Sequence, residues 1–380
     1  MTIAVEETMK ADTPEARRYN RIRRWLSVAD FLLGMALLAA LLAHGWSADL
    51  RDFSYRLAAQ NYTLAVFFYV LLLTTAAKLL GLPLDIYSFR LEHRFHLSNQ
   101  KLGGWARDQL KSWAVGLAIG TLLVELLYFT LRNWPQWWWV IAWVGFILLS
   151  VVLAQLAPIV LFPIFYKFRP LEDEGLRARL TRLSERAGTR VRGVYEWKLS
   201  EKTKKANAAL MGLGRTRRIV VADTLLENYT HDEIEAVLAH ELGHHVHRHI
   251  FKGILLQVVV TLFGFWAADA ALRYAIYDRQ MFAGLSDFAN LPLLALVSTV
   301  LSFILMPALN AYSRYNERQA DRYSWQSIAS VAPFISSMNK LADQNLAERT
   351  PSRLVEFFFH SHPPIAKRIA AAQAWARAKV

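Results

Sequence analysis

The sequence predicts a mainly α-helical, polytopic membrane protein with about six transmembrane helices and one soluble-type region that contains a small β-sheet. Of its 380 residues, 54% are hydrophobic and only 20% are charged. A helix needs about 20 mostly apolar residues to cross the hydrocarbon core of a bilayer. A soluble core would explain one or two runs of that length, but the chain has six: 26–46, 61–83, 113–131, 137–163, 253–272 and 291–310.

The basic residues indicate how these spans are oriented. A net charge of +13 is compatible with nucleic acid binding, but the Lys and Arg residues gather before the first span, between the second and third spans and in the C-terminal tail. The links 47–60, 132–136 and 273–290 hold few of them. Because basic loops stay on the cytoplasmic side, we expect both termini and residues 164–252 to be cytoplasmic. The predicted partner is a lipid bilayer, the inner or plasma membrane in a bacterium, and not nucleic acid.

Two features of the composition exclude other interpretations. The chain has no cysteine, which excludes disulfides, thiolate nucleophiles and cysteine-bound metals. The first apolar run is too long for a secretory signal peptide, and Trp46 does not suit the −3 position of a cleavage after Ala48. We therefore expect this run to be a retained span.

The alternation of apolar and polar stretches divides the chain into five regions. We expect the first of them to be polar and loosely ordered. The regions are a cytoplasmic N-terminal segment (1–24), a four-span membrane region with a cytoplasmic loop at 84–112 (25–163), the soluble-type region (164–252), two further spans (253–310) and a C-terminal cytoplasmic part (311–380).

The soluble-type region shows both helical and strand patterns. Residues 171–188 predict an amphipathic helix that ends at a glycine, and residues 191–199 and 218–225 predict two strands. The stretch 203–214 between the strands contains glycines suited to a turn or bulge. Thr230 and Glu233 then form a capping box, which opens a helix at about residue 231 that can continue unbroken into the fifth span.

The predicted helix carries the sequence His-Glu-Leu-Gly-His at 240–244. Residues four apart share one face of a helix, so His240 and His244 can bind the same ion. Neutral imidazole suits zinc, and a hydrolytic zinc site keeps one position for water. Glu241 would lie beside that water as its general base. The alternative is a chance order of residues on an ordinary helix. The capped, apolar context argues against that alternative, so we predict one Zn²⁺ per chain.

Three further histidines follow this motif: His245, His247 and His249. A catalytic zinc site does not need them as ligands, and a helix turns them to other faces. We expect them at the membrane interface or in solvent, with the lining of a cleft as the alternative for His245.

A third ligand is expected from the segment 313–321, which follows the sixth span and is predicted to be helical. It places Glu317 and Asp321 four residues apart on one face. One carboxylate can bind the metal, and the other can orient a ligand histidine. Beside the helix with the two histidines, Glu317 is the best candidate for the missing ligand. The alternative is a solvated face with ion pairs to the nearby arginines Arg314, Arg318 and Arg322.

These motifs resemble those of the type I CAAX prenyl proteases, which are integral-membrane zinc metallopeptidases. HELGH at 240–244 and ERQAD at 317–321 resemble the HExxH and ExxxD motifs of that family. The resemblance extends from about residue 60 to 370. It includes FRLEHRFHLSNQ at 89–100, PIFYKFRPLEDEGL at 163–176, ANAALMGLGRTRRIVVADTLL at 206–226 and SHPPIAKRI at 361–369.

The resemblance implies a zincin-like metalloprotease domain and roles for further residues. Asn207 and Ala208 would lie on an edge strand that binds the substrate backbone, with a surface hairpin as the alternative. His362 and Arg368 would stabilise the oxyanion or bind the substrate carboxylate. Their alternative is a helix N-terminus with a solvated basic residue. Asp321 would support a zinc-bound histidine. The resemblance also implies a ring of membrane helices around a chamber.

We therefore predict an integral-membrane zinc metalloendopeptidase that cleaves prenylated or membrane-associated peptides with a zinc-activated water. The chain has one N-terminal span fewer than the eukaryotic family members, which leaves a prenylated substrate open. The alternative within the protease class is a quality-control metalloprotease that degrades damaged or misfolded membrane proteins.

Two other classes of protein are less consistent with the sequence. A transporter, suggested by the intramembrane Asp269, would place its polar residues at the middle of the membrane, often in two related halves. Here the polar motifs lie outside the spans and no repeat is present. In a scaffold with a structural zinc, all four metal positions would be closed and Glu241 would have no role.

Overall fold

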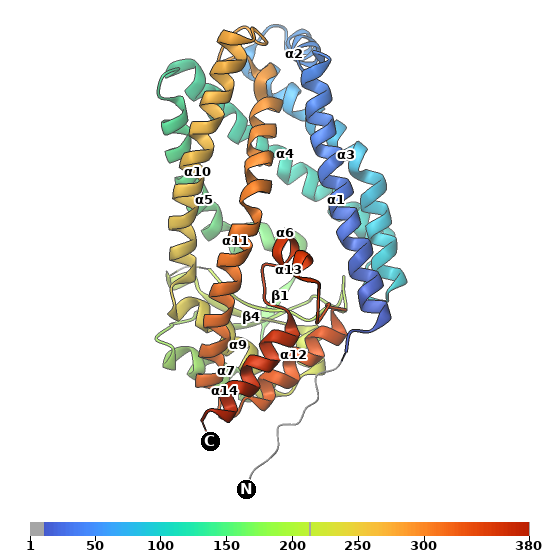
Figure 1. Ribbon diagram of the computed structural model, residues 1–380, viewed down its shortest axis with the longest axis vertical. Coiled ribbons are helices and arrows are strands. Elements are labelled where there is room, and N and C mark those ends of the chain that lie inside the picture. The colour runs from blue at the N-terminus through green and yellow to red at the C-terminus, as the bar shows by residue number, and fades with distance from the viewer. Residues whose placement is uncertain (1–10, 213, 380) are drawn as a thin grey trace.

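The computed structural model describes residues 11–212 and 214–379 and confirms the predicted helical membrane architecture. In Figure 1 the long helices extend from the end of the molecule that holds the sheet and the helices α7, α9, α12 and α14, whereas the short helix α2 lies at the opposite end. Within the described residues, six helical segments are long and apolar enough to cross a membrane. They are α1 (Pro14–Ala43), α3 (Tyr62–Arg94), α4 (Leu102–Asn133), α5 (Trp138–Leu156) with a π-helical turn and α6 (Phe162–Phe165), α10 (His249–Arg273) with a further π-helical turn, and α11 (Leu291–Ser327).

Several of these helices extend well beyond the apolar runs. The N-terminal segment 1–24 was expected to be loosely ordered. Its residues 1–10 lie outside the described residues. From Pro14 onward the expectation is wrong, because α1 begins there behind the cap residue Thr13. The predicted loop 84–112 is mostly helix, because α3 and α4 continue to Arg94 and from Leu102. Apolar length marks only the part of a helix that crosses the membrane, and polar helix-forming residues prolong the helix outside it.

The surfaces of these helices fit a bilayer. Large apolar side chains are exposed, for example Leu148 on α5 (63%), Val259 on α10 (65%) and Ile304 on α11 (63%). The intramembrane acid Asp269 accepts hydrogen bonds from Trp138 Nε1 (2.6 Å) and from Nε of Arg273 one turn away on α10 (2.8 Å). This carboxylate therefore links α10 to the start of α5, and it is not the free acid that a transporter would need. A shorter helix, α2 (Trp46–Leu57), connects α1 and α3.

The sheet has four strands in the order β1-β2-β4-β3, with β2 parallel to β4 and the outer pairs antiparallel. The strands are β1 (Phe168–Pro170), β2 (Val194–Trp197), β3 (Ala208–Met211) and β4 (Arg218–Ala222). Strand β3 lies inside the stretch 203–214 at the edge of the sheet and includes Ala208, as the resemblance implied, whereas Asn207 directly precedes the strand. The turn or bulge predicted from the glycines follows at the end of β3. There Gly212 has φ +88°, and a Cβ atom would lie 2.7 Å from the carbonyl oxygen of Thr216. The predicted strand 218–225 ends early, because α8 (Asp223–Asn228) begins within it.

Two helices cover the sheet. The predicted amphipathic helix is α7 (Glu174–Arg186), capped by Asp173, and the histidine motif lies on α9 (His231–Val246). Their apolar faces pack on β4 because leucines recur at helical spacing. The buried residues of this core include Leu176, Leu180, Leu183, Ile219, Val221, Leu238 and Leu242.

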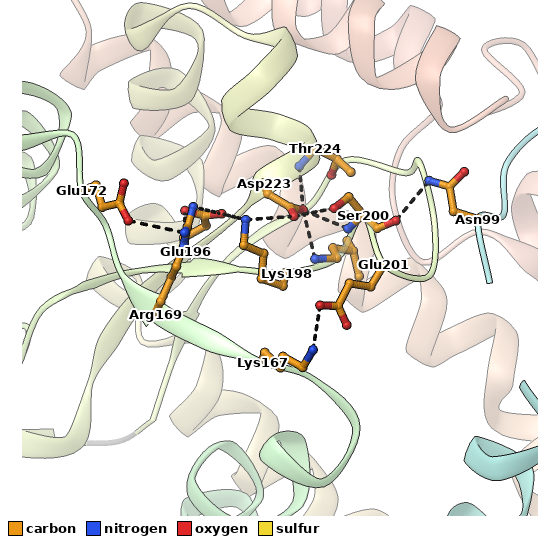
Figure 2. Close-up of polar contacts among 11 residues, drawn as sticks. Asn99, Lys167, Arg169, Glu172, Glu196, Lys198, Ser200, Glu201, Asp223 and Thr224 are labelled. Atoms are coloured by element: carbon orange, nitrogen blue, oxygen red, sulfur yellow. Dashed lines mark hydrogen bonds and ion pairs between the residues drawn. The ribbon is translucent and has the colours of Figure 1, made fainter. Parts of the chain in front are cut away.

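The loop after β2 is fixed by the carboxylate of Asp223 at the start of α8. This carboxylate accepts hydrogen bonds from Leu199 N (3.0 Å), Ser200 N (2.9 Å), Ser200 Oγ (2.6 Å) and Thr224 N (2.9 Å). Figure 2 shows these contacts converging on Asp223, with Asn99 on the far side of the loop. Asn99 Nδ2 donates to Ser200 O (3.1 Å), so the loop also connects the sheet to the segment between α3 and α4.

The C-terminal helices α12 (Ala332–Gln344), α13 (Arg353–Phe359) and α14 (Ile365–Arg377) complete this end of the molecule. The Glu233 carboxylate of α9 accepts hydrogen bonds from Ser336 Oγ (2.6 Å) and Lys340 Nζ (2.7 Å) of α12. At the N-terminal end of the described chain, Asp12 is buried and accepts a hydrogen bond from Thr350 Oγ1 (2.6 Å). Helix α14 contacts the C-terminal part of α11 through Arg368, which donates hydrogen bonds to Asp321.

Candidate metal centre

The helix that carries the two histidines starts at the predicted capping box. The Thr230 hydroxyl accepts a hydrogen bond from Glu233 N (3.3 Å), and the Glu233 carboxylate accepts one from Thr230 N (2.7 Å). From this start, α9 places His240 and His244 one turn apart near its C-terminal end, and their Nε2 atoms lie 3.3 Å from each other.

Helix α11 approaches α9 closely enough to add Glu317. The approach depends on Gly243, because a Cβ atom at that position would lie 2.8 Å from Cα of Ala320. One turn further along α11, Ser324 Oγ donates to Ala236 O of α9 (2.8 Å). The sixth span and the ERQAD motif form one continuous helix, so Glu317 is held by the same element that crosses the membrane. Sequence reasoning gave Gly243 no role, although a glycine in a helix interior suggests a packing reason.

Three side chains converge as expected. The Glu317 carboxylate lies 3.3 Å from His240 Nε2 through Oε2 and 3.3 Å from His244 Nε2 through Oε1. The donor atoms of the three residues all lie within 4.8 Å of one another. Glu317 is only 4% exposed, and its Oε2 has no hydrogen-bond partner among the described residues. A buried carboxylate that faces two imidazole nitrogens without a hydrogen bond fits a shared divalent cation.

A second layer of contacts fixes His240. Its Nδ1 lies 2.9 Å from Asp321 Oδ1, so Nδ1–H donates to the carboxylate, and Nε2, which faces Glu317, is the nitrogen available to a metal. Burial alone would lower the pKa of His240, but the Asp321 and Glu317 carboxylates raise it to about 9. The same negative surroundings that favour a protonated imidazole favour a bound cation.

Arg368 contacts both His240 and Asp321, and its Nη2 lies 3.3 Å from Nδ1 of His240. Its Nε and Nη2 donate to the two oxygens of Asp321 at 2.9 and 2.5 Å, and its side chain is only 10% exposed. The alternative of a solvated basic residue is therefore wrong. The expected direct role of Arg368 in oxyanion or carboxylate binding stays a prediction, for which Nη1 has no partner among the described residues. Arg368 holds Asp321, which in turn holds His240.

His362 lies at the open side of the cluster. Its side chain is 62% exposed, its Nε2 lies 3.3 Å from Glu317 Oε1, and its Nδ1 is 3.0 Å from Ser361 Oγ. Glu241 follows His240 on α9, and among the described residues it has no hydrogen bond or ion pair. Burial raises the pKa of Glu241. An acid whose affinity for protons is raised and whose oxygens are unengaged is suited to general base chemistry.

The edge strand β3 presents a defined set of backbone groups. Ala222 N of β4 donates to Asn207 O (3.0 Å), and the register pairs Ala208 with Val221. Because antiparallel partners alternate along a ladder, the N–H and C=O of Ala208 and Leu210 point away from β4. The side chain of Asn345 occupies the position before this edge: its Oδ1 accepts a hydrogen bond from Ala206 N (2.9 Å), and its Nδ2 donates to Ala206 O (3.3 Å).

One of the three additional histidines is close to the cluster, contrary to expectation. The helix predicted to continue unbroken is interrupted at Arg248, which has φ +56°, and α10 begins at His249. His249 is buried, and its Nδ1 lies 3.0 Å from His244 Nδ1. No glycine or asparagine marks this break, so the sequence carried no signal for it.

Comparison with known proteins agrees with this geometry. Residues 170–376 match the family model described as peptidase family M48, and residues 4–167 match the model described as CAAX prenyl protease N-terminal, five membrane helices. The chain is 32% identical over 357 residues to the uncharacterized metalloprotease YhfN of Bacillus subtilis, covering 93% of this chain and 84% of that protein. It is 27% identical to the probable CAAX prenyl protease 1 of Schizosaccharomyces pombe, covering 97% and 80%. The crystal structure of S. mikatae Ste24p has the same fold, with a TM-score of 0.84, 24% identity and coverage of 94% and 87%.

Proposed function

The chain belongs to peptidase family M48, and from this premise we propose which of its residues cleave a peptide and which substrates it takes. It is an integral, multi-pass membrane metalloprotease of the CAAX prenyl protease type. Three donor groups from α9 and α11 converge, and this convergence supports the proposal most strongly. They are His240 Nε2, His244 Nε2 and the Glu317 carboxylate.

The donor set of two imidazoles and one carboxylate suits zinc. Zinc held by these residues would supply Lewis acidity for the scissile carbonyl and for a water. Glu241 then accepts the proton of the attacking water and passes it to the leaving amine. Nε2 of His362, at the open side of the site, donates a hydrogen bond to the oxygen on which negative charge develops.

The substrate adds to the sheet as a further strand along β3. The outward N–H and C=O groups of Ala208 and Leu210 bind its backbone, and Asn207 lies at the entrance to this edge. The Asn345 side chain blocks the edge at Ala206. Support for this proposal comes from the register, which leaves these backbone groups without a partner in the sheet.

An apolar cavity beside β3 supports a substrate that carries a large apolar group. The cavity has a volume of about 220 Å³ and lies between the strand and two membrane helices. Its lining includes Leu210 and Gly212 of the β3 end, Ile147 and Val151 of α5, and Ile250 and Ile254 of α10. Because the cavity borders both the substrate edge and the membrane helices, we propose prenylated or membrane-associated peptides as substrates. We place the site and both termini on the cytoplasmic side, as the basic loops indicate.

The experiment compares a farnesylated CAAX peptide with its unprenylated twin, using the zinc-loaded protein in detergent. We expect kcat/KM to be at least about tenfold higher for the farnesylated peptide, which corresponds to about 1.4 kcal/mol of apolar burial in the transition state. Equal cleavage of the two peptides would contradict prenyl selectivity and favour the quality-control protease. Cleavage of neither peptide would contradict the proposed substrate class.

A further inference from the structure

The chain makes an unusual turn between α9, which carries His240 and His244, and α10. Helix α9 ends at Val246, Arg248 adopts the left-handed conformation (φ +56°, ψ +36°), and α10 begins at His249. On a continuous helix His249 would lie about 140° around the axis from His244. The left-handed residue, which carries a conformational cost for a residue with a Cβ atom, turns His249 back toward His244 instead.

Both nitrogens of the His249 ring are engaged. Nδ1 lies 3.0 Å from Nδ1 of His244, and Nε2 lies 2.9 Å from Oε1 of Gln319 on α11. The rings of His244 and His249 meet edge to face, with centroids 5.1 Å apart and planes at 72°. The Gln319 amide nitrogen donates to the hydroxyl of Tyr315 (3.1 Å). His249 thus connects the proposed ligand on α9 to the same helix that supplies Glu317.

The orientation of the Gln319 amide, with Oε1 toward His249 and Nε2 toward Tyr315, assigns the protons. The carbonyl oxygen of Gln319 only accepts, so His249 carries its proton on Nε2 and presents a bare Nδ1. That nitrogen accepts a hydrogen bond from Nδ1–H of His244, which leaves the His244 Nε2 lone pair directed at Glu317. With the Gln319 amide reversed, the proton would move to His244 Nε2 and remove the donor that a metal requires.

We propose that His249 is a positioning residue, which fixes the tautomer and the ring orientation of the zinc ligand His244. The inference rests on the proposed metal site and goes beyond it, because it assigns a function to a histidine outside both metal motifs. The two histidine ligands then have different supports. His240 is backed by the carboxylate of Asp321, whereas His244 is backed by a neutral imidazole and an amide.

The test is a zinc titration of the full-length protein in detergent, after removal of metal and in competition with a fluorescent chelator. His249→Leu fills the buried space without an acceptor, and we expect it to weaken zinc affinity about 10- to 100-fold. His249→Asn places an oxygen acceptor near the position of Nδ1, and we expect it to restore most of that loss. His245→Ala is the matched control, because it removes a neighbouring imidazole that among the described residues has no hydrogen bond to a proposed ligand or to His249. Its zinc affinity should equal that of the parent.

The outcomes are distinguishable. A leucine variant with parental zinc affinity would overturn the inference, and so would leucine and asparagine variants that are weakened equally. If the leucine variant does not elute as a single folded species, His249→Ala takes its place against His249→Asn. A parent protein that binds no zinc would contradict the proposed metal site itself, whereas parental binding with no effect of His249 contradicts only its positioning role.

Discussion

The side chains that surround His240 and His244 act by fixing the position of a proton. Asp321 accepts from Nδ1 of His240, and Arg368 holds Asp321 through two hydrogen bonds. The contact between Asp321 and Nδ1 leaves Nε2 of His240 facing Glu317. The carboxylate of Glu317 is the group that joins both histidines, since its two oxygens lie at 3.3 Å from one imidazole each.

Glu317 is therefore the residue whose charge we expect the metal to require most. Glu317→Gln keeps the size of the side chain but replaces a charged ligand with a neutral one. We expect zinc affinity to fall by at least about 100-fold, beyond the range for partners that only support a ligand. Elemental analysis after dialysis measures the retained zinc. The control is Glu356→Gln, because Glu356 is an acid that pairs with Lys367 of α14 (2.6 Å) and not with the histidines. Parental zinc content in the Glu317 variant would remove this residue from the site.

Among the elements, the edge strand β3 holds two adjacent alanines whose N–H groups point in opposite directions. Ala208 directs its N–H outward, whereas Ala209 directs its N–H to β4 in the alternating ladder. Proline has no N–H and is tolerated only where the sheet does not use that group. Ala208→Pro should keep the fold and zinc content but raise KM about three- to tenfold, because one backbone hydrogen bond to the peptide is lost. Ala209→Pro should instead lower the thermal unfolding midpoint. Equal behaviour of the two variants in both measurements would contradict strand addition at β3.

The loop held by Asp223 makes a pH-dependent contribution to stability. Burial alone would raise the pKa of Asp223, but the hydrogen bonds from Ser200, Thr224 and Leu199 hold it below its usual value. A carboxyl with a lowered folded-state pKa stabilises the protein above its unfolded pKa of about 3.9, and this stability is lost as the pH falls through the folded-state value. Asp223→Asn should therefore cost about 1.5–3 kcal/mol at pH 7.

The difference between the parent and Asp223→Asn should shrink as the pH falls below about 4. Thermal unfolding midpoints measured from pH 7 to pH 3 test this. The exposed acid Glu172, whose contact to Arg169 is 3.4 Å, provides the control, and Glu172→Gln should match the parent throughout. A destabilisation by Asp223→Asn that is constant over the whole range would show that its charge is not involved.

The sequence predicted the elements that depend on local residue patterns better than those that depend on contacts between distant segments. The capping box at Thr230, the spacing of His240 and His244 and the apolar runs are local patterns, and each was confirmed. The break at Arg248 has no local signal, and with it the position of His249 was missed. The edge position of β3 depends on pairing with β4, which is a non-local property, so residue patterns alone favoured a surface hairpin and only the resemblance placed Ala208 on an edge strand. Glu317 was a candidate from its helix face, and only the approach of α11 at Gly243 brings it to the histidines.

At the scale of the whole molecule, the metal centre and the sheet lie at one end of the bundle, and the link between α10 and α11 lies at the other (Figure 1). Basic residues predict that the first end faces the cytoplasm. The chain has no cysteine, so single introduced cysteines report their side of the membrane without interference.

Gly284→Cys lies in the link between α10 and α11, where a Cβ atom meets no neighbour within 4 Å. We expect a membrane-impermeant maleimide to label it in intact cells. Glu172→Cys, at a position with a 78% exposed side chain near the sheet, should be labelled only after lysis. The parent protein serves as the unlabelled control. The opposite pattern would reverse the assigned orientation.

In the proposed mechanism Glu241 separates metal binding from catalysis, because it would lie beside the zinc ligands without being one of them. The most direct measurement compares the zinc content and the peptide hydrolysis rate of the purified parent and of Glu241→Gln. We expect about one zinc per chain in both proteins. The hydrolysis rate of the variant should be about 10²- to 10⁴-fold lower than that of the parent. Hydrolysis at the parental rate in Glu241→Gln, or a parent that binds no zinc, would contradict the proposed mechanism.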